Sequence, residues 1–284
     1  MSQSGKPGGL QRSHQRAGSW SLHPGVTAGT WDYVRSGHVA GQYDVFLEND
    51  PLTEQDWRYI SNYLPAGPAD MVVADFGSGT GRHVLNLLQY GCSKVLGVDL
   101  SVAMLGEAMG KVREKKSEFR SGQTFCPLLA NLVELDGIVS NSVDFGICMF
   151  SMLGMIRGKQ NRQRFLDHAY RILKPGSRFI VHAHNYWYQS RYPGGWKWML
   201  GNGWKTLMGR AEIGDRQADY RSIRNLFIHS YRYGEFCREL NNSGFRLIDT
   251  SRLIAGSPEP RRESHWGDCF RTIGWLVACE RVPS

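Results

Sequence analysis

Residues 71–81 read Met-Val-Val-Ala-Asp-Phe-Gly-Ser-Gly-Thr-Gly, and this stretch decides the fold of the chain. The apolar residues at its start predict a buried strand, and the three glycines predict a tight loop that opens a helix. The first N–H groups of such a helix have no intrahelical partners and attract an anionic ligand group. Further on, residues 95–98 predict a second strand, and Asp99 at its end is placed to accept hydrogen bonds from ribose hydroxyls. The sequence therefore predicts a pocket for a nucleoside-bearing cofactor.

The spacing of the glycines indicates which cofactor binds. A dinucleotide fingerprint, G-x-G-x-x-G, would need a glycine where this chain has Arg82. The chain instead has Gly77, Gly79 and Gly81, with Asp75 two residues ahead of the first glycine. This pattern resembles the first motif, D-x-G-x-G-x-G, of the class I S-adenosylmethionine-dependent methyltransferases. The resemblance implies S-adenosylmethionine as the cofactor and leaves an NAD-dependent oxidoreductase as a weaker alternative.

Further stretches resemble later motifs of the same family and follow in its order. They are Asp99-Leu100-Ser101, Ala130-Asn131-Leu132, the fourth-strand motif at residues 143–147 and the turn Leu173-Lys174-Pro175-Gly176. The resemblance covers roughly residues 40–282. Because cofactor motifs of this kind are retained, a non-catalytic cofactor-binding scaffold is a weaker alternative than an enzyme.

The resemblance implies a set of cofactor-binding residues. Asp75 would organise the glycine loop and the methionine amino end, Arg82 would pair with the methionine carboxylate, and Leu100 would pack beside the adenine. Asn131 replaces the more usual Asp of the family, and its carbonyl can still accept from the adenine amine. The full set is Tyr43, Asp75, Gly77, Ser78, Gly79, Arg82, Asp99, Leu100, Asn131, Leu132 and Phe150.

The acceptor side of the site has weaker sequence signals. His184 and Asn185 end the predicted fifth strand, and His229 precedes the last predicted core helix. Ligands lie at the carboxyl edge of an open α/β sheet, so we expect these three side chains to be catalytic, as acceptor-binding or proton-handling groups. His182 shares a strand face with His184 and is expected to be an interior histidine.

Alternating apolar and amphipathic segments predict an α/β fold of one domain, residues 31–284. We expect a Rossmann-like, seven-stranded, mostly parallel sheet with helices on both faces and an antiparallel last strand. Residues 186–231 are rich in aromatic residues and glycine, which predicts a lid insertion after strand five. Its tryptophans, Trp196, Trp198 and Trp204, should line the acceptor pocket or form the core of the lid. Residues 1–30 have no apolar periodicity and predict a disordered tail.

The strands are expected near residues 71–75, 94–98, 125–129, 143–150, 178–184, 245–253 and 272–281. The helices are expected near residues 53–63, 80–90, 102–115, 161–172 and 233–243.

Composition narrows the class of protein further. The chain has 284 residues and a formal net charge of +8, part of it from the N-terminal segment and part from residues 186–232. No stretch approaches the roughly 20 apolar residues of a membrane-spanning helix, so no membrane partner is expected. The six cysteines include no C-x-x-C pair, which predicts reduced thiols, no bound metal and a cytoplasmic location.

The sequence favours a small or medium-sized molecule as the methyl acceptor. An RNA-modifying methyltransferase is the alternative, because a basic and aromatic insertion would also suit stacking on bases. The acceptor atom and the oligomeric state stay open.

Overall fold

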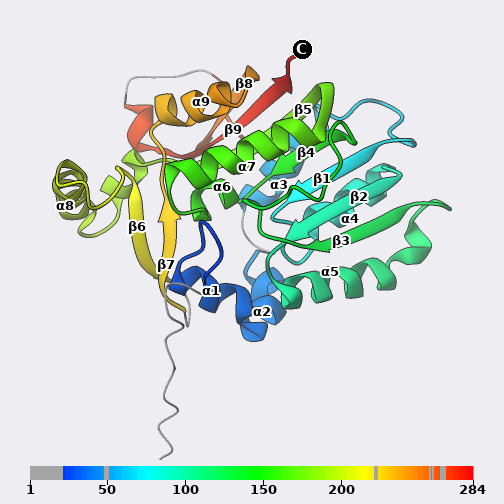
Figure 1. Ribbon diagram of the computed structural model, residues 1–284, viewed down its shortest axis with the longest axis horizontal. Coiled ribbons are helices and arrows are strands. Elements are labelled where there is room, and N and C mark those ends of the chain that lie inside the picture. Colours follow the sequence, from blue (N-terminus) through cyan, green and yellow to red (C-terminus); the bar gives the residue numbers. More distant parts are fainter. Residues whose placement is uncertain are drawn as a thin grey trace, which may run out of the picture.

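The computed structural model describes residues 22–47, 51–220, 223–255, 257, 259–262 and 267–283. A seven-stranded sheet has the order β3–β2–β1–β4–β5–β9–β8, and a second sheet is the hairpin β6–β7. The strands are β1 (Val72–Phe76), β2 (Lys94–Asp99), β3 (Thr124–Leu129), β4 (Val143–Cys148), β5 (Leu173–His184), β6 (Asp215–Tyr220), β7 (Ile223–His229), β8 (Phe245–Ile254) and β9 (Thr272–Arg281). Strand β9 runs antiparallel to both of its neighbours, and the other pairings of the large sheet are parallel. The predicted sheet is confirmed (Figure 1).

The helices are α1 (Ala28–Arg35), α2 (Gly37–Leu47), α3 (Pro51–Ser61), α4 (Arg82–Tyr90), α5 (Val102–Glu114), α6 (Met152–Met155), α7 (Lys159–Ile172), α8 (Gly195–Leu207) and α9 (Tyr233–Asn242). Short 3-10 helices are η2 (Lys116–Glu118), η3 (Trp187–Arg191) and η4 (Asp268–Phe270). The five predicted core helices correspond to α3, α4, α5, α7 and α9.

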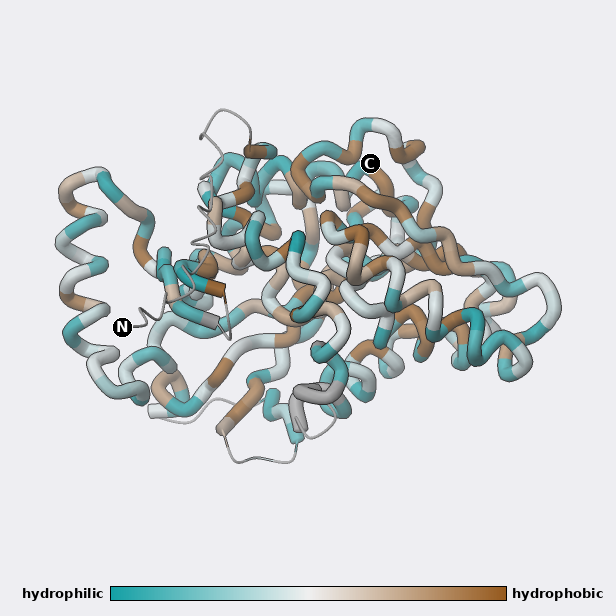
Figure 2. Tube along the Cα trace, turned by 90° about the horizontal axis from the view of Figure 1, so that it is seen from below, coloured by the Kyte–Doolittle hydropathy of each residue, from teal (hydrophilic) through white to brown (hydrophobic). Residues whose placement is uncertain are grey.

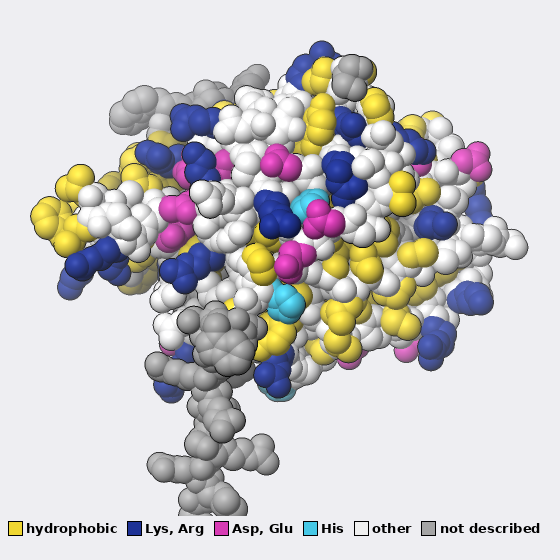
Figure 3. All heavy atoms as spheres, in the orientation of Figure 1, with side chains coloured by type: hydrophobic (Ala, Val, Ile, Leu, Met, Phe, Trp, Pro, Cys, Tyr) yellow, Lys and Arg dark blue, Asp and Glu magenta, His cyan; other side chains and the backbone are white. Residues whose placement is uncertain are grey.

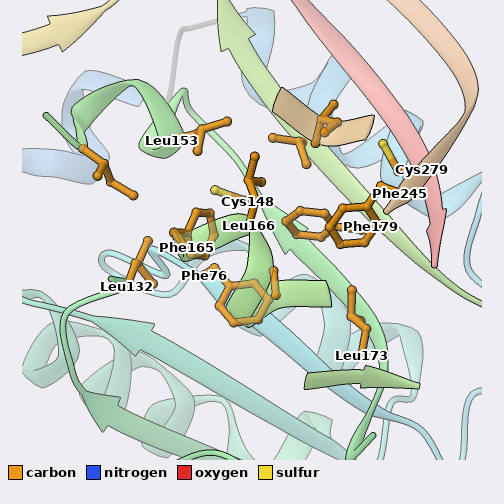
Figure 4. Close-up of a cluster of buried hydrophobic side chains, with 14 of the residues drawn as sticks. Phe76, Leu132, Cys148, Leu153, Phe165, Leu166, Leu173, Phe179, Phe245 and Cys279 are labelled. Carbon is orange, nitrogen blue, oxygen red and sulfur yellow. The ribbon is translucent and has the colours of Figure 1, made fainter. Parts of the chain in front are cut away.

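Apolar side chains cover both faces of the large sheet, because neighbouring residues of a strand point to opposite faces. Val73 packs on the face that carries α3 and α4, and Ala74 packs on the face that carries α7 and α9. Figure 4 shows the second cluster, in which Phe76, Phe165 and Phe179 meet across β1, α7 and β5. The hydropathy view shows the same concentration of apolar residues in the central strands (Figure 2).

The segment between β5 and α9 contains η3, α8 and the hairpin β6–β7. The hairpin packs on the N-terminal helices and α5, where Ile223 and Leu226 join Val39, Ala40 and Met104 in one apolar cluster. The expectation for the tryptophans is wrong in two cases, because Trp196 and Trp204 on α8 are 55% and 65% exposed. That this segment acts as a lid stays a prediction.

The prediction of a disordered tail up to residue 30 is wrong for residues 22–30. Helix α1 begins at Ala28, and Thr27 caps it by accepting a hydrogen bond from the N–H of Thr30 at 3.2 Å. Residues 22–30 lack apolar periodicity, and their order comes from contacts with distant residues such as Asn131. Residues 1–21 lie outside the described residues.

Candidate active site

The glycine loop is fixed to the carboxyl end of β2. The N–H groups of Gly77 and Ser78 both donate to the carbonyl of Val98, at 2.7 and 3.0 Å. Gly77 has a φ of +87°, and a Cβ there would lie 2.4 Å from Cγ of Met152. Both the backbone conformation and the close contact therefore require glycine at this position.

Asp99 joins the loop to the next helix. Its Oδ2 accepts the N–H of Gly79 and its Oδ1 accepts the N–H of Ser101, both at 2.8 Å. Ser101 in turn caps α5 by accepting the N–H of Met104 at 3.3 Å. Burial raises the pKa of Asp99, and the backbone hydrogen bonds partly offset this. A carboxylate offers about four acceptor positions, so Asp99 retains capacity for a ligand.

A mostly apolar cavity opens beside Asp99, at the carboxyl edge of β1, β2 and β4. Its volume is about 110 Å³, whereas cofactor pockets measure roughly 300–1,000 Å³. A nucleoside cofactor therefore fits only after some of the lining moves. The lining consists of Pro24, Gly25, Val26, Thr30, Tyr33, Val34, Gly77, Gly79, Asp99, Leu100, Ser101, Met104, Asn131, Leu132, Phe150, Met152, Met155 and Ile156.

Residues 24–34 form one wall of this cavity, and we call them the N-terminal cover. The carbonyl of Pro24 accepts a hydrogen bond from Nδ2 of Asn131 at 3.0 Å, and the carbonyl of Val34 accepts one from Oγ of Ser101 at 2.6 Å. Sequence reasoning missed this wall and named Tyr43 instead. Tyr43 belongs to α2, but its side chain lies outside the described residues.

Asn131 lines the cavity as predicted, although its amide already has several partners. Besides its bond to Pro24, Nδ2 donates to Glu134 at 3.1 Å, and Oδ1 accepts the N–H of Val133 at 3.2 Å. The side chain thus holds the cover in place. Contact with adenine stays a prediction for Asn131 and for its neighbour Leu132.

Asp75, Ser78 and Arg82 are not part of the cavity lining. Arg82 reaches the buried carboxylate of Asp56 with Nη2 at 3.2 Å and places its guanidinium 5.1 Å from the Phe150 ring. Phe150 therefore contacts both the cavity and the Arg82 guanidinium. Phe150 has a φ of 55° and Ser151 one of 57°, a strained pair of non-glycine residues just after β4.

Behind Phe150 lies a group of buried polar side chains, which we call the polar cluster: Asp75, Arg82, His83 and His182. Several polar atoms of this cluster have no hydrogen-bond partner among the described residues. They are Oδ2 of Asp75, Nη1 of Arg82, Nδ1 of His83 and both ring nitrogens of His182. Burying such atoms unpaired costs about 1–3 kcal/mol each. Several such atoms in one place indicate a position for a polar ligand.

The charges of the polar cluster follow from its burial. Burial raises the pKa of Asp75 to about 7, against the attraction of Arg82, and the nearby Asp99 charge raises it further. Burial also holds the pKa of His83 and of His182 well below the usual value, with the Arg82 charge acting in the same direction. Both imidazoles are therefore neutral at pH 7.

The three predicted catalytic residues do not line the cavity. Asn185 is fully buried, and its Nδ2 donates to the carbonyls of Cys269 and Thr272 at 2.6 and 2.7 Å while Oδ1 accepts the N–H of Trp187. These bonds make Asn185 a structural link between the end of β5 and the segment of η4 and β9, and a catalytic role for Asn185 stays a prediction. His184 adjoins the polar cluster, with its ring 5.2 Å from that of His182, and burial lowers its pKa to about 4.

His229 lies outside the cavity lining in a buried ion network, and its catalytic role stays a prediction. Its Nδ1 lies 2.8 Å from Asp215 and its Nε2 lies 3.3 Å from Glu235. Burial alone would lower the pKa of His229, but the neighbouring carboxylates of Asp215 and Glu235 raise it above the usual value. The network also contains Arg162 and Glu239 and joins the β6–β7 hairpin to α7 and α9.

This network predicts a pH dependence of stability. A histidine whose pKa is raised on folding stabilises the protein fully below its unfolded pKa of about 6.5, and this contribution is lost as the pH rises through the folded pKa. We expect the free energy of unfolding, measured with urea between pH 6 and pH 9, to fall with pH in the wild type and less steeply in His229→Gln. The control His168→Gln removes a histidine whose pKa is lowered by burial, so the free energy of unfolding should fall with pH at least as steeply as in the wild type. Equal slopes for His229→Gln and the wild type would contradict the assignment.

Residues 74–181 match the family model of the methyltransferase domain. This part of the chain is a methyltransferase domain, and its fold is that of S-adenosylmethionine-dependent methyltransferases. The protein is thus an enzyme that transfers methyl groups, and S-adenosylmethionine is its cofactor. No protein of curated function matches the sequence.

Solved structures share the fold of this methyltransferase. One is an S-adenosylmethionine-dependent methyltransferase from Methanosarcina mazei, with 19% identity, coverage of 80% of this chain and 98% of that chain, and a TM-score of 0.63. Another is the CcbJ methyltransferase from Streptomyces caelestis, with 18% identity, coverage of 86% and 96%, and a TM-score of 0.58. A third, from Haloferax volcanii, is a putative methyltransferase in complex with its activator, with 15% identity, coverage of 87% and 97%, and a TM-score of 0.57.

The side chains of this methyltransferase fit the chemical parts of S-adenosylmethionine. The cavity offers apolar walls for a base and the Asp99 carboxylate for a ribose. The unpartnered Oδ2 of Asp75 can accept from an ammonium group, and the unpartnered Nη1 of Arg82 can donate to a carboxylate. The donor set therefore suits a ligand with an adenosine at one end and an amino acid at the other.

The N-terminal cover should be required for tight cofactor binding. Deleting residues 1–35 removes a cavity wall and the hydrogen bonds of Asn131 and Ser101, so we expect the dissociation constant of S-adenosylhomocysteine to rise at least tenfold, about 1.4 kcal/mol. Deleting residues 1–21 spares the cover and should change the constant less than twofold. Calorimetry on both proteins, with melting curves to show folding, measures this. Equal affinities of the two truncated proteins would exclude the cover from the binding site.

Proposed function

We propose that this methyltransferase transfers the sulfonium methyl group to a small or medium-sized acceptor that binds next to the polar cluster. The observation that supports this is the set of unpartnered ring nitrogens on His83 and His182, two buried side chains next to Arg82. A group that pairs with these atoms must be compact enough to enter an enclosed space. A small acceptor meets this condition more readily than a base that is part of a folded RNA.

The cofactor would bridge the two parts of the site. We assign Asp99 to the ribose hydroxyls, and Leu100, Asn131 and Leu132 to the adenine. Gly77, Ser78 and Gly79 contribute the loop backbone. Arg82 lies against Phe150 and interacts with Asp75, and these two residues would hold the carboxylate and amino groups of the methionine part. Phe150 would then lie beside the reacting groups.

S-adenosylmethionine supplies an electrophilic methyl group on a positively charged sulfur. The residues of the chain then have to position the acceptor and exclude water. His184 adjoins the polar cluster and, with a pKa of about 4, is neutral at pH 7, so it can accept a hydrogen bond from the acceptor but is a weak base. We therefore propose a positioning role for His184.

The pH dependence of cofactor binding tests the role of Asp75. Only the ionised carboxylate pairs well with the ammonium group, and burial raises its pKa to about 7 in the free protein. We expect the affinity for S-adenosylhomocysteine to rise about tenfold from pH 6 to pH 7.5, because the ionised fraction of Asp75 rises by nearly that factor. Calorimetry of Asp75→Asn should give weaker binding with no such rise. A flat profile for the wild type would remove Asp75 from the site.

The acceptor class is tested by turnover with a labelled methyl donor. The purified protein would be incubated with S-adenosylmethionine carrying an isotopic methyl label, once with a metabolite extract and once with total RNA. We expect the label in small molecules, and variants of the polar cluster such as His182→Gln should lower that incorporation without changing cofactor affinity. Label found only in RNA nucleosides would favour the RNA alternative, which the basic residues of the 186–232 segment support.

The six cysteines are free in the part of the chain that the structure describes. Free thiols support the proposal of a cytoplasmic location, where thiols are kept reduced.

A further inference from the structure

Helix α8 exposes a stripe of large apolar side chains. Trp196, Leu200, Trp204 and Leu207 are 55%, 76%, 65% and 79% exposed, and Met208 extends the row just past the helix. Their spacing of three or four residues places them on one face of the helix. We call these five residues the α8 stripe. Figures 1 and 2 show α8 at the margin of the molecule, and Figure 3 shows apolar side chains gathered there.

The opposite face of α8 is firmly attached. Met199 and Asn202 are buried, and Asn202 donates to the carbonyl of Glu212 at 3.1 Å while it accepts the N–H of Gly214 at 2.8 Å. Trp198 packs its ring 5.7 Å from that of Tyr186. These contacts fix the rotation of the helix about its axis, and they therefore keep the α8 stripe facing away from the rest of the protein.

The charged side chains of α8 itself have one sign. Lys197 and Lys205 lie on α8, Arg191 and Arg210 flank it, and all four are exposed. Residues 195–207 contain no Asp or Glu. Figure 3 shows basic side chains next to the apolar ones at this margin. A surface that pairs with α8 should therefore be apolar in its interior and negatively charged at its boundary.

We propose that α8 docks the protein on the surface of an anionic membrane, with the α8 stripe in the acyl region and the lysines at the lipid phosphates. Helices of this type lie in the membrane plane and bury their apolar face about 5–10 Å deep. Tryptophan is favoured at the membrane–water interface, and lysine can extend its charged end to the headgroups. This inference goes beyond the proposed function and does not depend on it.

Two other occupants fit the stripe less well. A second copy of the chain would bring Lys197 and Lys205 of one helix towards the same lysines of the other, with no acidic residue on α8 to compensate. An RNA would find tryptophan rings to stack on, but Leu200 and Leu207, the most exposed members, offer it neither a ring face nor a donor. A membrane uses both the apolar and the basic residues. Docking of this kind needs no spanning segment, and no helix among the described residues is long and apolar enough to cross a bilayer.

Vesicle sedimentation with the full chain tests the proposal. We expect binding to phosphatidylcholine vesicles that contain 30% phosphatidylglycerol, at least tenfold weaker binding to pure phosphatidylcholine, and weakening by 0.5 M NaCl. Changing Trp196, Leu200 and Trp204 together to Gln should lower binding more than tenfold. Lys197→Gln with Lys205→Gln should lower it about fivefold per lysine. The matched control, Val139→Gln with Ile248→Gln, changes exposed apolar residues elsewhere and should bind like the wild type.

Two further measurements make the outcome decisive. All variants should keep wild-type S-adenosylhomocysteine binding and melting temperature, because the changed residues are exposed. Quenching of tryptophan fluorescence by brominated lipid should fall by more than half in Trp196→Phe with Trp204→Phe while binding persists. The proposal is overturned if anionic vesicles do not bind the wild type, or if the stripe variant binds them equally. The proposal is also overturned if the stripe variant still binds the vesicles but no longer dimerises, measured by sedimentation velocity, or no longer binds tRNA, measured by a gel shift.

Discussion

Asp99→Ala should weaken the binding of S-adenosylhomocysteine about 150-fold, or about 3 kcal/mol. The proposed function assigns the Asp99 carboxylate to two ribose hydroxyls, and hydrogen bonds to a charged group contribute about 1.5–3 kcal/mol each. Asp99 borders the cavity and is 9% exposed, so this carboxylate is shielded from the water that would otherwise replace its ligand. Isothermal titration calorimetry at pH 7.5 measures the effect.

The same substitution also removes structural bonds, and a second variant separates the two effects. Asp99→Ala leaves the N–H groups of Gly79 and Ser101 without their acceptor, which should lower the melting temperature. Asp99→Asn retains one carbonyl acceptor but lacks the charge, so it should lose at least tenfold in affinity with a smaller loss of stability.

A matched control is Asp144→Asn. Asp144 also accepts a backbone N–H, that of Val72 at 2.9 Å, but at the opposite edge of the sheet. The Asp144→Asn variant should be less stable than the wild type but should bind S-adenosylhomocysteine with unchanged affinity. Unchanged affinity in Asp99→Ala would exclude Asp99 from ribose binding.

The strands and the glycine loop could be predicted from sequence because their signals are local. Buried parallel strands need continuous apolar runs, and the turn after β1 needs glycine at Gly77, where any Cβ would meet Met152. The alternation of strands and helices then predicts a mostly parallel sheet. Asp99 was predictable for the same reason, because it is the residue at which β2 ends.

The N-terminal cover and the ion network depend on contacts between distant parts of the chain, and no local pattern reveals such contacts. Pro24 is held by Asn131, 107 residues away. His229 resembled an active-site histidine because it precedes a helix, but β7 pairs it with Asp215 in the hairpin. Asn185 directly follows β5, and its amide donates to the carbonyls of Cys269 in η4 and Thr272 in β9.

Arg162 carried a signal that sequence reasoning missed. It lies on the buried face of α7 together with Phe165, Leu166 and Ala169, where an unpaired arginine would be very costly. A charged residue within an apolar helix face predicts an oppositely charged partner. The sequence alone could not say that the partner is Glu239 on α9.

We expect Arg162→Met to lower the free energy of unfolding by about 3–5 kcal/mol, because it leaves a buried charge without its partner. Arg162 is fully buried, and it donates through Nε and Nη2 to both oxygens of Glu239, at 3.2 and 2.9 Å, and to Glu212 at 2.8 Å. Glu239, at 1% exposure, also accepts from the hydroxyl of Tyr231 at 3.0 Å. Urea unfolding at pH 7 measures the loss.

The double variant Arg162→Met with Glu239→Leu distinguishes an unpaired charge from lost packing. Replacing a buried ion pair by apolar residues of similar size is often neutral, so the double variant should recover most of the stability that Arg162→Met loses. Arg58→Met provides the exposed control, because its bonds to Glu54 and Glu259 lie at the surface and should contribute less than about 1 kcal/mol. If the double variant is as unstable as Arg162→Met, packing of the arginine side chain is responsible. If it recovers, the ion pair acts mainly to specify how α7, α9 and the hairpin assemble beside the active site.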